Sequence, residues 1–118
     1  MATHNEKGRV GESMACDYLR EKGYAILETN WRYGKLEADI IAYTDDIIVF
    51  VEVKTRRSRL FGDPEEAVDY QKLQNLQGAM NHYIKYHHID REVRLDIISI
   101  VGTIGTIPQI DHIMDIVL

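Results

Sequence analysis

Residues 47–59 read IIVFVEVKTRRSR. The first part of this stretch is apolar and mostly β-branched, which is typical of a buried β-strand. Glu52 interrupts the apolar run, and Lys54 follows it two residues later, just before a cluster of arginines. The stretch therefore predicts a core strand whose charged end is either a solvated strand end or a functional site.

The rest of the chain supplies helices and strands in a definite order around this strand. A helical pattern runs from Gly8 to about Lys22, and Gly23 is a natural stop. Three strands are then predicted, at 24–31, 36–43 and 47–55, with a tight turn at Asp45 and Asp46 between the last two. A helix from Pro64 to about His87 follows, and further strands are predicted at 94–101 and within 107–118. The order α-β-β-β-α-β-β predicts a single α/β domain over residues 1–118, with a central mixed sheet flanked by helices.

The composition narrows the class of protein. With 45% apolar and 28% charged residues, the chain fits a globular, soluble domain. No stretch approaches the roughly 18 apolar residues of a membrane span, no signal peptide is visible, and a lone cysteine cannot form an internal disulfide, so a cytoplasmic location without membrane contact is expected. The net charge of −5 disfavours nucleic acid as a partner, but Lys54, Arg56, Arg57 and Arg59 place four of the 14 basic residues within six positions.

Charged residues interrupt two neighbouring predicted strands. Because residues two apart in a strand point to the same face, Glu52 shares a face with Lys54, and Glu37 shares a face with Asp39. The apolar residues around them predict strands that are covered on both faces, where an unpaired charge is costly. Either Glu52 and Lys54 pair with each other or lie at an exposed strand end, or the carboxylates converge on a cation.

Each predicted helix also points one charged residue towards the core. On a helical wheel, Glu12 falls between Leu19 and Cys16 on the apolar arc of the first helix. Lys72 lies among apolar residues of the long helix, although a lysine there can extend its ammonium group past them into solvent.

These charged residues form a set with a chemical meaning: Glu12, Glu37, Asp39, Glu52, Lys54 and Lys72. Carboxylate oxygens are the ligands that Mg²⁺ and Mn²⁺ prefer, and such an ion activates water and stabilises charge on a phosphoryl group. A nearby lysine can orient or deprotonate that water, or stabilise the transition state. The set therefore predicts phosphodiester hydrolysis.

The same stretches carry a resemblance to a known family. They are Gly11-Glu12, EADIIA at 37–42, FVEVKTR at 50–56, GDP at 62–64 and RLDIISI at 94–100. As a set, and over nearly the whole chain, they resemble the YraN family of small bacterial proteins. That family is similar to archaeal Holliday-junction resolvases and carries the restriction-endonuclease-like core, PD-(D/E)xK, in which an acid on one strand is followed by E-x-K on the next.

The resemblance implies roles for individual residues. Asp39 and Glu52 would hold Mg²⁺ or Mn²⁺, Glu12 would complete the ligand set directly or through water, and Lys54 would serve the attacking water. Two further catalytic candidates, Glu37 and Lys72, occupy positions that usually carry the same residue types. The chain departs from the family pattern at residue 36, where leucine replaces a common glycine.

Three functions are compatible with these residues. The first is a metal-dependent endonuclease acting on DNA, including branched DNA, with the basic segment 54–59 holding backbone phosphates. A homodimer would suit a symmetric junction, since two sites related by a two-fold axis can cut two strands. The second is a non-catalytic module that binds nucleic acid or a protein on the same fold, and the third is an assembly protein whose charges form only ion pairs.

Two other groups of polar residues invite simpler explanations. Asp96 interrupts an apolar strand, and Arg94 is its neighbour on the same face, which favours a structural ion pair. The segment WRYGK at 31–35 is either a surface that stacks on bases and contacts phosphates, or an exposed loop with one buried aromatic residue.

Overall fold

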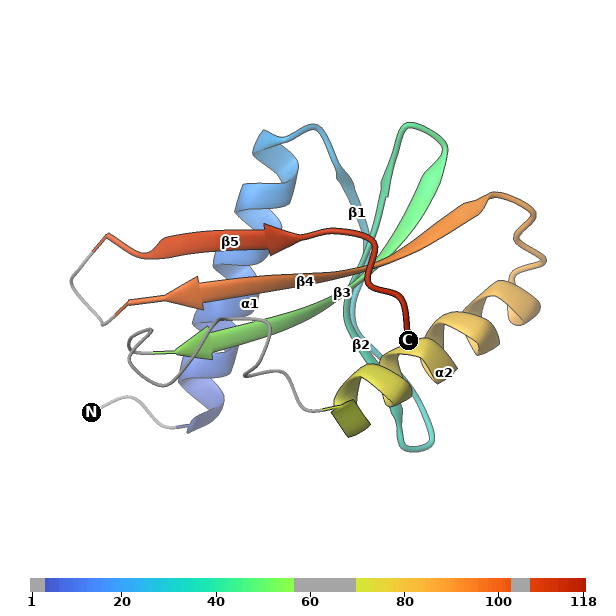
Figure 1. The fold of residues 1–118 in the computed structure, drawn as a ribbon, viewed down its shortest axis with the longest axis horizontal. Helices are drawn as coiled ribbons and strands as arrows, with labels where there is room; N and C mark the ends of the chain where they lie inside the picture. The colour runs from blue at the N-terminus through green and yellow to red at the C-terminus, as the bar shows by residue number, and fades with distance from the viewer. Residues whose placement is uncertain (1–3, 57–69, 103–106) are drawn as a thin grey trace.

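A five-stranded sheet lies between two helices in the computed structural model, which describes residues 4–56, 70–102 and 107–118 (Figure 1). The elements are α1 (His4–Glu21), β1 (Ala25–Tyr33), β2 (Leu36–Thr44), β3 (Ile47–Arg56), α2 (Tyr70–Tyr86), β4 (Glu92–Val101) and β5 (Gln109–Ile113). The predicted element order is confirmed. None of the described helices is long and apolar enough to cross a membrane.

The strands follow one another across the sheet in chain order, β1-β2-β3-β4-β5. β3 and β4 are parallel, and the other neighbouring pairs are antiparallel. A parallel pair needs a crossover connection, and α2 lies in the one between β3 and β4. The predicted mixed sheet of an α/β fold is confirmed, and the arrangement is consistent with a nuclease-like core.

Short-range signals in the sequence account for several element ends. Gly23 is left-handed (φ 94°) and ends α1, with the Tyr24 N–H donating to the Leu19 carbonyl at 2.9 Å. Asp45 and Asp46 both have positive φ, as the tight turn of a β-hairpin requires. These predicted boundaries are therefore correct to within about two residues.

Three predicted elements differ from the structure by more than two residues or extend beyond its described part. The first helix begins at His4, four residues before its predicted start at Gly8. The long helix ends at Tyr86, one residue from the predicted end, whereas its predicted start at Pro64 lies outside the described residues. The last strand covers only residues 109–113 instead of the whole apolar stretch. It stops because the chain turns at Asp115 (φ 59°) and the Ile116 N–H bonds back to the Leu95 carbonyl at 2.8 Å.

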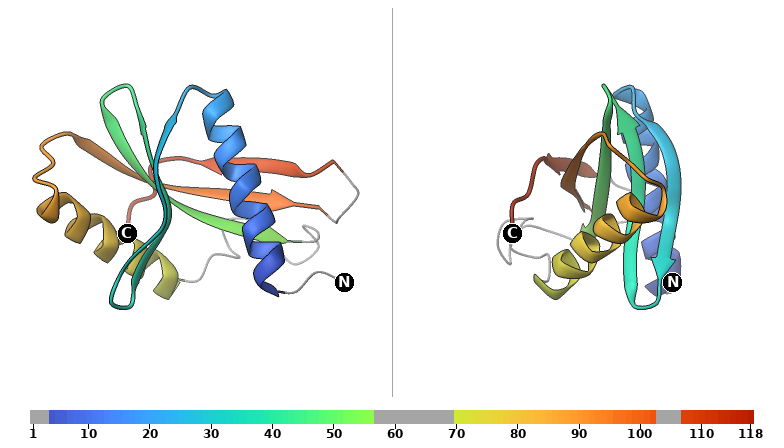
Figure 2. Two further views of the ribbon diagram at one scale, coloured as in Figure 1. Left: turned by 180° about the vertical axis from the view of Figure 1, so that it is seen from behind. Right: turned by 90° about the vertical axis from the view of Figure 1, so that its right-hand side faces the viewer.

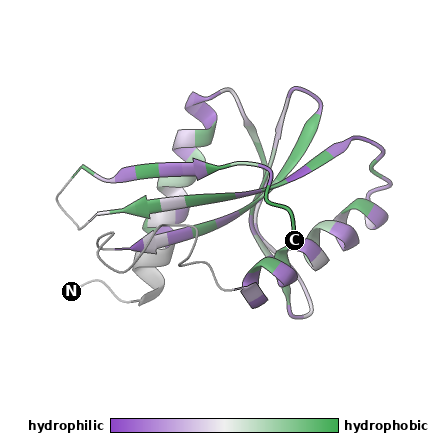
Figure 3. Cartoon of the chain, viewed as in Figure 1, coloured by the Kyte–Doolittle hydropathy of each residue, from purple (hydrophilic) through white to green (hydrophobic). Residues whose placement is uncertain are grey.

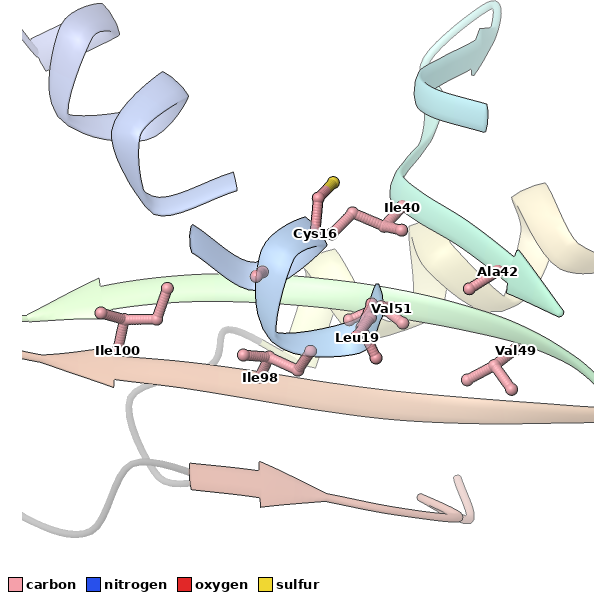
Figure 4. Close-up of a cluster of buried hydrophobic side chains, with 9 residues drawn as sticks. Cys16, Leu19, Ile40, Ala42, Val49, Val51, Ile98 and Ile100 are labelled. Carbon is pink, nitrogen blue, oxygen red and sulfur yellow. The ribbon is translucent and has the colours of Figure 1, made fainter. Parts of the chain in front are cut away.

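The helices cover opposite faces of the sheet, and each buries its own apolar cluster (Figure 2). On the α1 face, Ala15, Cys16 and Leu19 pack on alternate residues of the central strands (Figure 4). On the α2 face, Leu76, Ala79 and Tyr83 pack on the residues in between, including Phe50. Strands buried on both faces read as continuous apolar runs, which is why IIVFV and IISIV carry almost no alternation.

The predicted ion pair between Arg94 and Asp96 is confirmed and belongs to a larger network under α1. Arg94 donates from Nε and Nη2 to the two carboxylate oxygens of Asp96, each at 2.8 Å, and from Nη2 to the Tyr24 hydroxyl. His112 Nε2 lies 2.7 Å from Asp96 Oδ2, and its Nδ1 lies 3.1 Å from the Tyr18 hydroxyl. Burial opposes ionisation of the fully buried Asp96, but hydrogen bonds from His112 and Arg94 outweigh it and lower the pKa of that carboxyl.

Removing one hydroxyl from this network tests its structural role. We expect Tyr24→Phe to lower the free energy of unfolding by about 1–2 kcal/mol, because Arg94 loses a partner in a half-buried site. Tyr43→Phe is the matched control, since the Tyr43 hydroxyl accepts from exposed Arg91 at 2.6 Å, and it should cost less than about 1 kcal/mol. Urea denaturation measures both, and equal losses in the two variants would contradict the prediction.

Candidate active site between strands β2 and β3

The candidate site lies where β2 and β3 separate. Their paired residues run from Thr44 and Ile47 to Ile40 and Val51, and the next rung would join Asp39 to Glu52. At that rung no backbone pairing continues, and the Asp39 side chain takes its place: Oδ2 accepts a hydrogen bond from the Val53 N–H at 2.8 Å. A carboxylate thus replaces a backbone partner, and the two strands diverge around it.

A local change of face in β2 turns Asp39 towards β3. Ile41 and Ala38 both contribute to the cluster on the α2 face, although strict alternation would send them to opposite faces. The β1 residue opposite this change, Asn30, is left-handed (φ 50°), and asparagine tolerates that conformation. Asp39 consequently points along the sheet and into the gap between the strands.

Glu52 is the buried member of the pair. Its side chain shares the α2 face with Phe50, and the residue is only 6% exposed. In Figure 3, β3 changes from hydrophobic to hydrophilic towards its C-terminal end, where Glu52 and Lys54 follow the apolar run. Glu52 is therefore not at an exposed strand end, and within the described part of the chain it makes no ion pair with Lys54.

The two carboxylates disfavour each other's charge. Burial, together with repulsion from Asp39, raises the pKa of Glu52 to about 8, although Lys72 and Lys54 oppose the rise. Burial also raises the pKa of Asp39 to about 6, with the Val53 N–H opposing this and Glu12 adding to it. A buried acid next to a half-buried one, with too little positive charge around them, is in a suitable state to receive a cation.

The structure brings the predicted charged residues together around this pair. Glu12, Glu37 and Lys72 are near enough to act electrostatically on Asp39. Glu37, Lys54 and Lys72 do the same for Glu52. The six residues come from α1, β2, β3 and α2, so only the folded chain assembles them.

Contacts on two sides fix the outer members of this set. Gly11 lets α1 approach β3 closely, because a Cβ there would overlap Thr55 Cγ2, and this approach brings Glu12 to the site. Glu37 is half-exposed and forms a 3.5 Å ion pair with Arg32 of β1. Lys72 is exposed at the start of α2, so its charge acts on the site from the solvent side. This agrees with the alternative in which the lysine extends its ammonium group past its apolar neighbours into solvent.

Leu36, where the family pattern commonly has glycine, packs against α2. It contributes to the cluster on the α2 face, and a methyl group on Gly78 of α2 would lie 2.8 Å from its Cδ2. The leucine is thus matched by a glycine on the facing helix.

The three predicted metal ligands are not equivalent. Among the described residues, no group of three or more Asp, Glu, His or Cys side chains is positioned to hold an ion, so Glu12 does not form a ready-made cluster with Asp39 and Glu52. The buried pair still fits a hard cation, because Mg²⁺ is commonly held by one or two carboxylates and completes its shell with water and phosphate oxygens. The metal itself stays a prediction.

The predicted basic segment is only partly described. Lys54 is half-buried near the carboxylates, and Arg56 is the last residue of β3. Arg57 and Arg59 lie outside the described residues.

Sequence reasoning missed the rings that accompany Trp31 and Tyr33. His82 and Tyr86 of α2 line a cavity with them. The available signal was their spacing of four residues, which places both on one face of a helix.

A comparison with known families identifies the family of this chain. The model of a family described as "Uncharacterised protein family UPF0102" matches residues 11–100, which include all six charged residues of the site. The chain belongs to this family. This confirms the resemblance to the YraN family, which is the same family. The similarity to archaeal Holliday-junction resolvases stays a prediction.

UPF0102 relatives share most of their length with this chain. A UPF0102 protein of Bacteroides thetaiotaomicron is 48% identical over 115 residues, covering 98% of this chain and 94% of the relative. One from Christiangramia forsetii is 47% identical over 116 residues, covering 98% and 96%. One from Porphyromonas gingivalis is 43% identical over 113 residues, covering 95% and 84%. Their descriptions state no activity.

Proposed function

We propose that this UPF0102 protein is a metal-dependent endonuclease that hydrolyses phosphodiester bonds in DNA, including branched DNA of the Holliday-junction type. The observation that carries the proposal is the pair of half-buried Asp39 and buried Glu52, held at the separation of β2 and β3 with raised pKa values. A structural role does not account for this pair, because burying Glu52 next to a second acid makes its ionised form destabilising to the fold. The resemblance to archaeal Holliday-junction resolvases and their PD-(D/E)xK site supports the same reaction.

The proposed roles follow from the position of each side chain. Asp39 and Glu52 would hold Mg²⁺ or Mn²⁺, whose chemistry there is to acidify water and to stabilise negative charge on the phosphoryl group. Lys54 orients or deprotonates the attacking water from its place beside Glu52. Glu12, which acts electrostatically on Asp39, would complete the ligand set directly or through a bridging water.

Binding of DNA by a chain of net charge −5 requires a local explanation. Lys54 and Lys72 supply positive charge at the site, Arg56 follows at the end of β3, and a bound divalent cation would add to this charge. A symmetric junction presents two scissile strands, so the proposal includes a homodimer with two such sites.

Calorimetric titration with Mn²⁺ tests the proposal first. We expect the wild type to bind the ion and Glu52→Gln to lose binding, because the variant keeps the shape of the side chain but removes its negative charge. Glu92→Gln is the matched control, since Glu92 is exposed at the opposite end of the β3-β4 pair, and it should bind like the wild type.

The same three proteins are then incubated with branched and linear DNA. Metal-dependent cleavage by the wild type and by Glu92→Gln, without cleavage by Glu52→Gln, supports the proposal. A wild type that binds no Mn²⁺ would overturn it in favour of the non-catalytic binding module.

A further inference from the structure

An aromatic cavity lies on the same side of the sheet as Glu52, near the end of the β1-β2 hairpin. It has a volume of about 380 Å³ and is lined by Trp31 and Tyr33 of β1 and by His82 and Tyr86 of α2. We name these four residues the aromatic slot. Tyr33 is 56% exposed and Tyr86 is 71% exposed, so the slot opens to solvent.

The rings of the aromatic slot are ordered by contacts with one another and with the core. Tyr33 stacks on His82 with ring centroids 3.6 Å apart, and Trp31 is tilted towards the same ring at 6.2 Å. Behind the slot, Trp31 meets buried Tyr83 edge to face at 5.4 Å, and Tyr83 in turn meets Phe50. The wall is thus attached to the core, which makes it a preformed surface for a flat ligand.

The composition of the aromatic slot favours a nucleobase over an aliphatic ligand. Every lining residue carries a ring, and bases stack on such rings regardless of their sequence. Two exposed basic residues lie close to the lining residues in the chain: Lys35 at the hairpin turn, two residues after Tyr33, and Lys85 in the last turn of α2, next to Tyr86. They supply the positive charge that a phosphate backbone next to a stacked base requires.

The aromatic slot and the carboxylate pair are connected through the hairpin. Trp31 pairs with Ala38 in the sheet, next to Asp39, and Arg32 pairs with Glu37. Along α2, ten residues separate Lys72 at the carboxylates from His82 at the slot, which corresponds to about 15 Å, or to the rise of about four nucleotides. A DNA strand of about four nucleotides therefore spans the distance from the carboxylate pair to the aromatic slot.

We propose that the aromatic slot binds an unpaired nucleobase of the DNA strand whose backbone lies at Asp39 and Glu52, so that the substrate class is DNA with single-stranded nucleotides next to the cleaved bond. A base inside a duplex is covered on both faces by its neighbours, and it must leave the stack to enter such a site. The position of the cleaved bond relative to the slot rests on the proposed nuclease function. The binding of the base does not.

The fluorescence of Trp31 reports on the aromatic slot directly, because it is the only tryptophan in the chain. We titrate the 118-residue chain with a short oligothymidylate in EDTA, which prevents cleavage. The wild type should lose fluorescence on binding, and Tyr86→Ala should bind about tenfold more weakly, the effect of one lost base-aromatic stack. Tyr70→Ala is the matched control, since Tyr70 is an exposed tyrosine at the other end of α2, and it should bind like the wild type.

An oligonucleotide of the same length without bases separates stacking from phosphate binding. It should cause no quenching in the wild type and should bind equally to the wild type and to Tyr86→Ala. Unchanged Trp31 fluorescence with oligothymidylate, or equal affinity of wild type and Tyr86→Ala for it, would overturn the proposal.

The outcomes also distinguish this proposal from the nuclease function. Quenching that Glu52→Gln retains and Tyr86→Ala weakens supports the aromatic slot even if no DNA is cleaved. Metal-dependent cleavage with no quenching leaves the nuclease in place and overturns the aromatic slot.

Discussion

Asp39→Asn and Glu52→Gln are each expected to lower the rate of DNA cleavage by at least about a thousandfold. Both substitutions keep the size of the side chain and remove a carboxylate from the pair. A thousandfold loss corresponds to about 4 kcal/mol of transition-state stabilisation, which is within the several kcal/mol that a metal ion supplies in phosphoryl chemistry. Initial rates on labelled branched DNA with Mg²⁺ measure the effect.

Glu92→Gln controls for the change of glutamate to glutamine and should cleave at the wild-type rate, because its side chain is exposed and remote from the pair. Circular dichroism establishes that each variant is folded. Cleavage at the wild-type rate by either Asp39→Asn or Glu52→Gln would contradict a catalytic role for the pair.

The sequence predicts the elements of this fold because most of its structure is specified locally. Runs of β-branched residues, a glycine after α1 and a pair of aspartates between β2 and β3 set strands, a helix end and a turn with little help from distant residues. The alternation of faces also places Glu52 on the α2 side, opposite the core residues of α1. The charged set could therefore be assembled from periodicity and from the family resemblance.

The detailed shape of the site depends on contacts that periodicity does not contain. A regular strand would place Asp39 on a face of the sheet, but β2 changes face beside left-handed Asn30, and the carboxylate turns towards Val53. Likewise, His112 joins the Asp96 network only because β5 lies beside β4. Irregular strands and pairings between distant segments are decided by tertiary packing, so the sequence patterns alone miss them.

The free energy of unfolding should depend on pH through Glu52, and Glu52→Gln should remove that dependence. Its pKa rises from 4.5 to about 8 in the folded protein, so between these values the folded state holds a proton that the unfolded state has released. Because the folded state binds more protons in this window, the stability of the wild type should fall as pH rises from about 4.5 to about 8. In EDTA at pH 8.5, we expect Glu52→Gln to be more stable than the wild type by about 3–5 kcal/mol, and to be nearly equal to it at pH 4.5.

Urea denaturation across this pH range measures the difference, with Glu92→Gln expected to follow the wild type. Adding Mn²⁺ at pH 8.5 should then stabilise the wild type and leave Glu52→Gln unchanged, because only the folded wild type offers the ion a pair of carboxylates. With these results, Glu52 would lower the stability of the metal-free protein and raise it only when a cation is bound. Its role would then be to bind the cation and not to stabilise the fold. Parallel pH profiles for the wild type and Glu52→Gln would show that the Glu52 charge is already compensated within the protein, and would remove the main physical argument for a metal site.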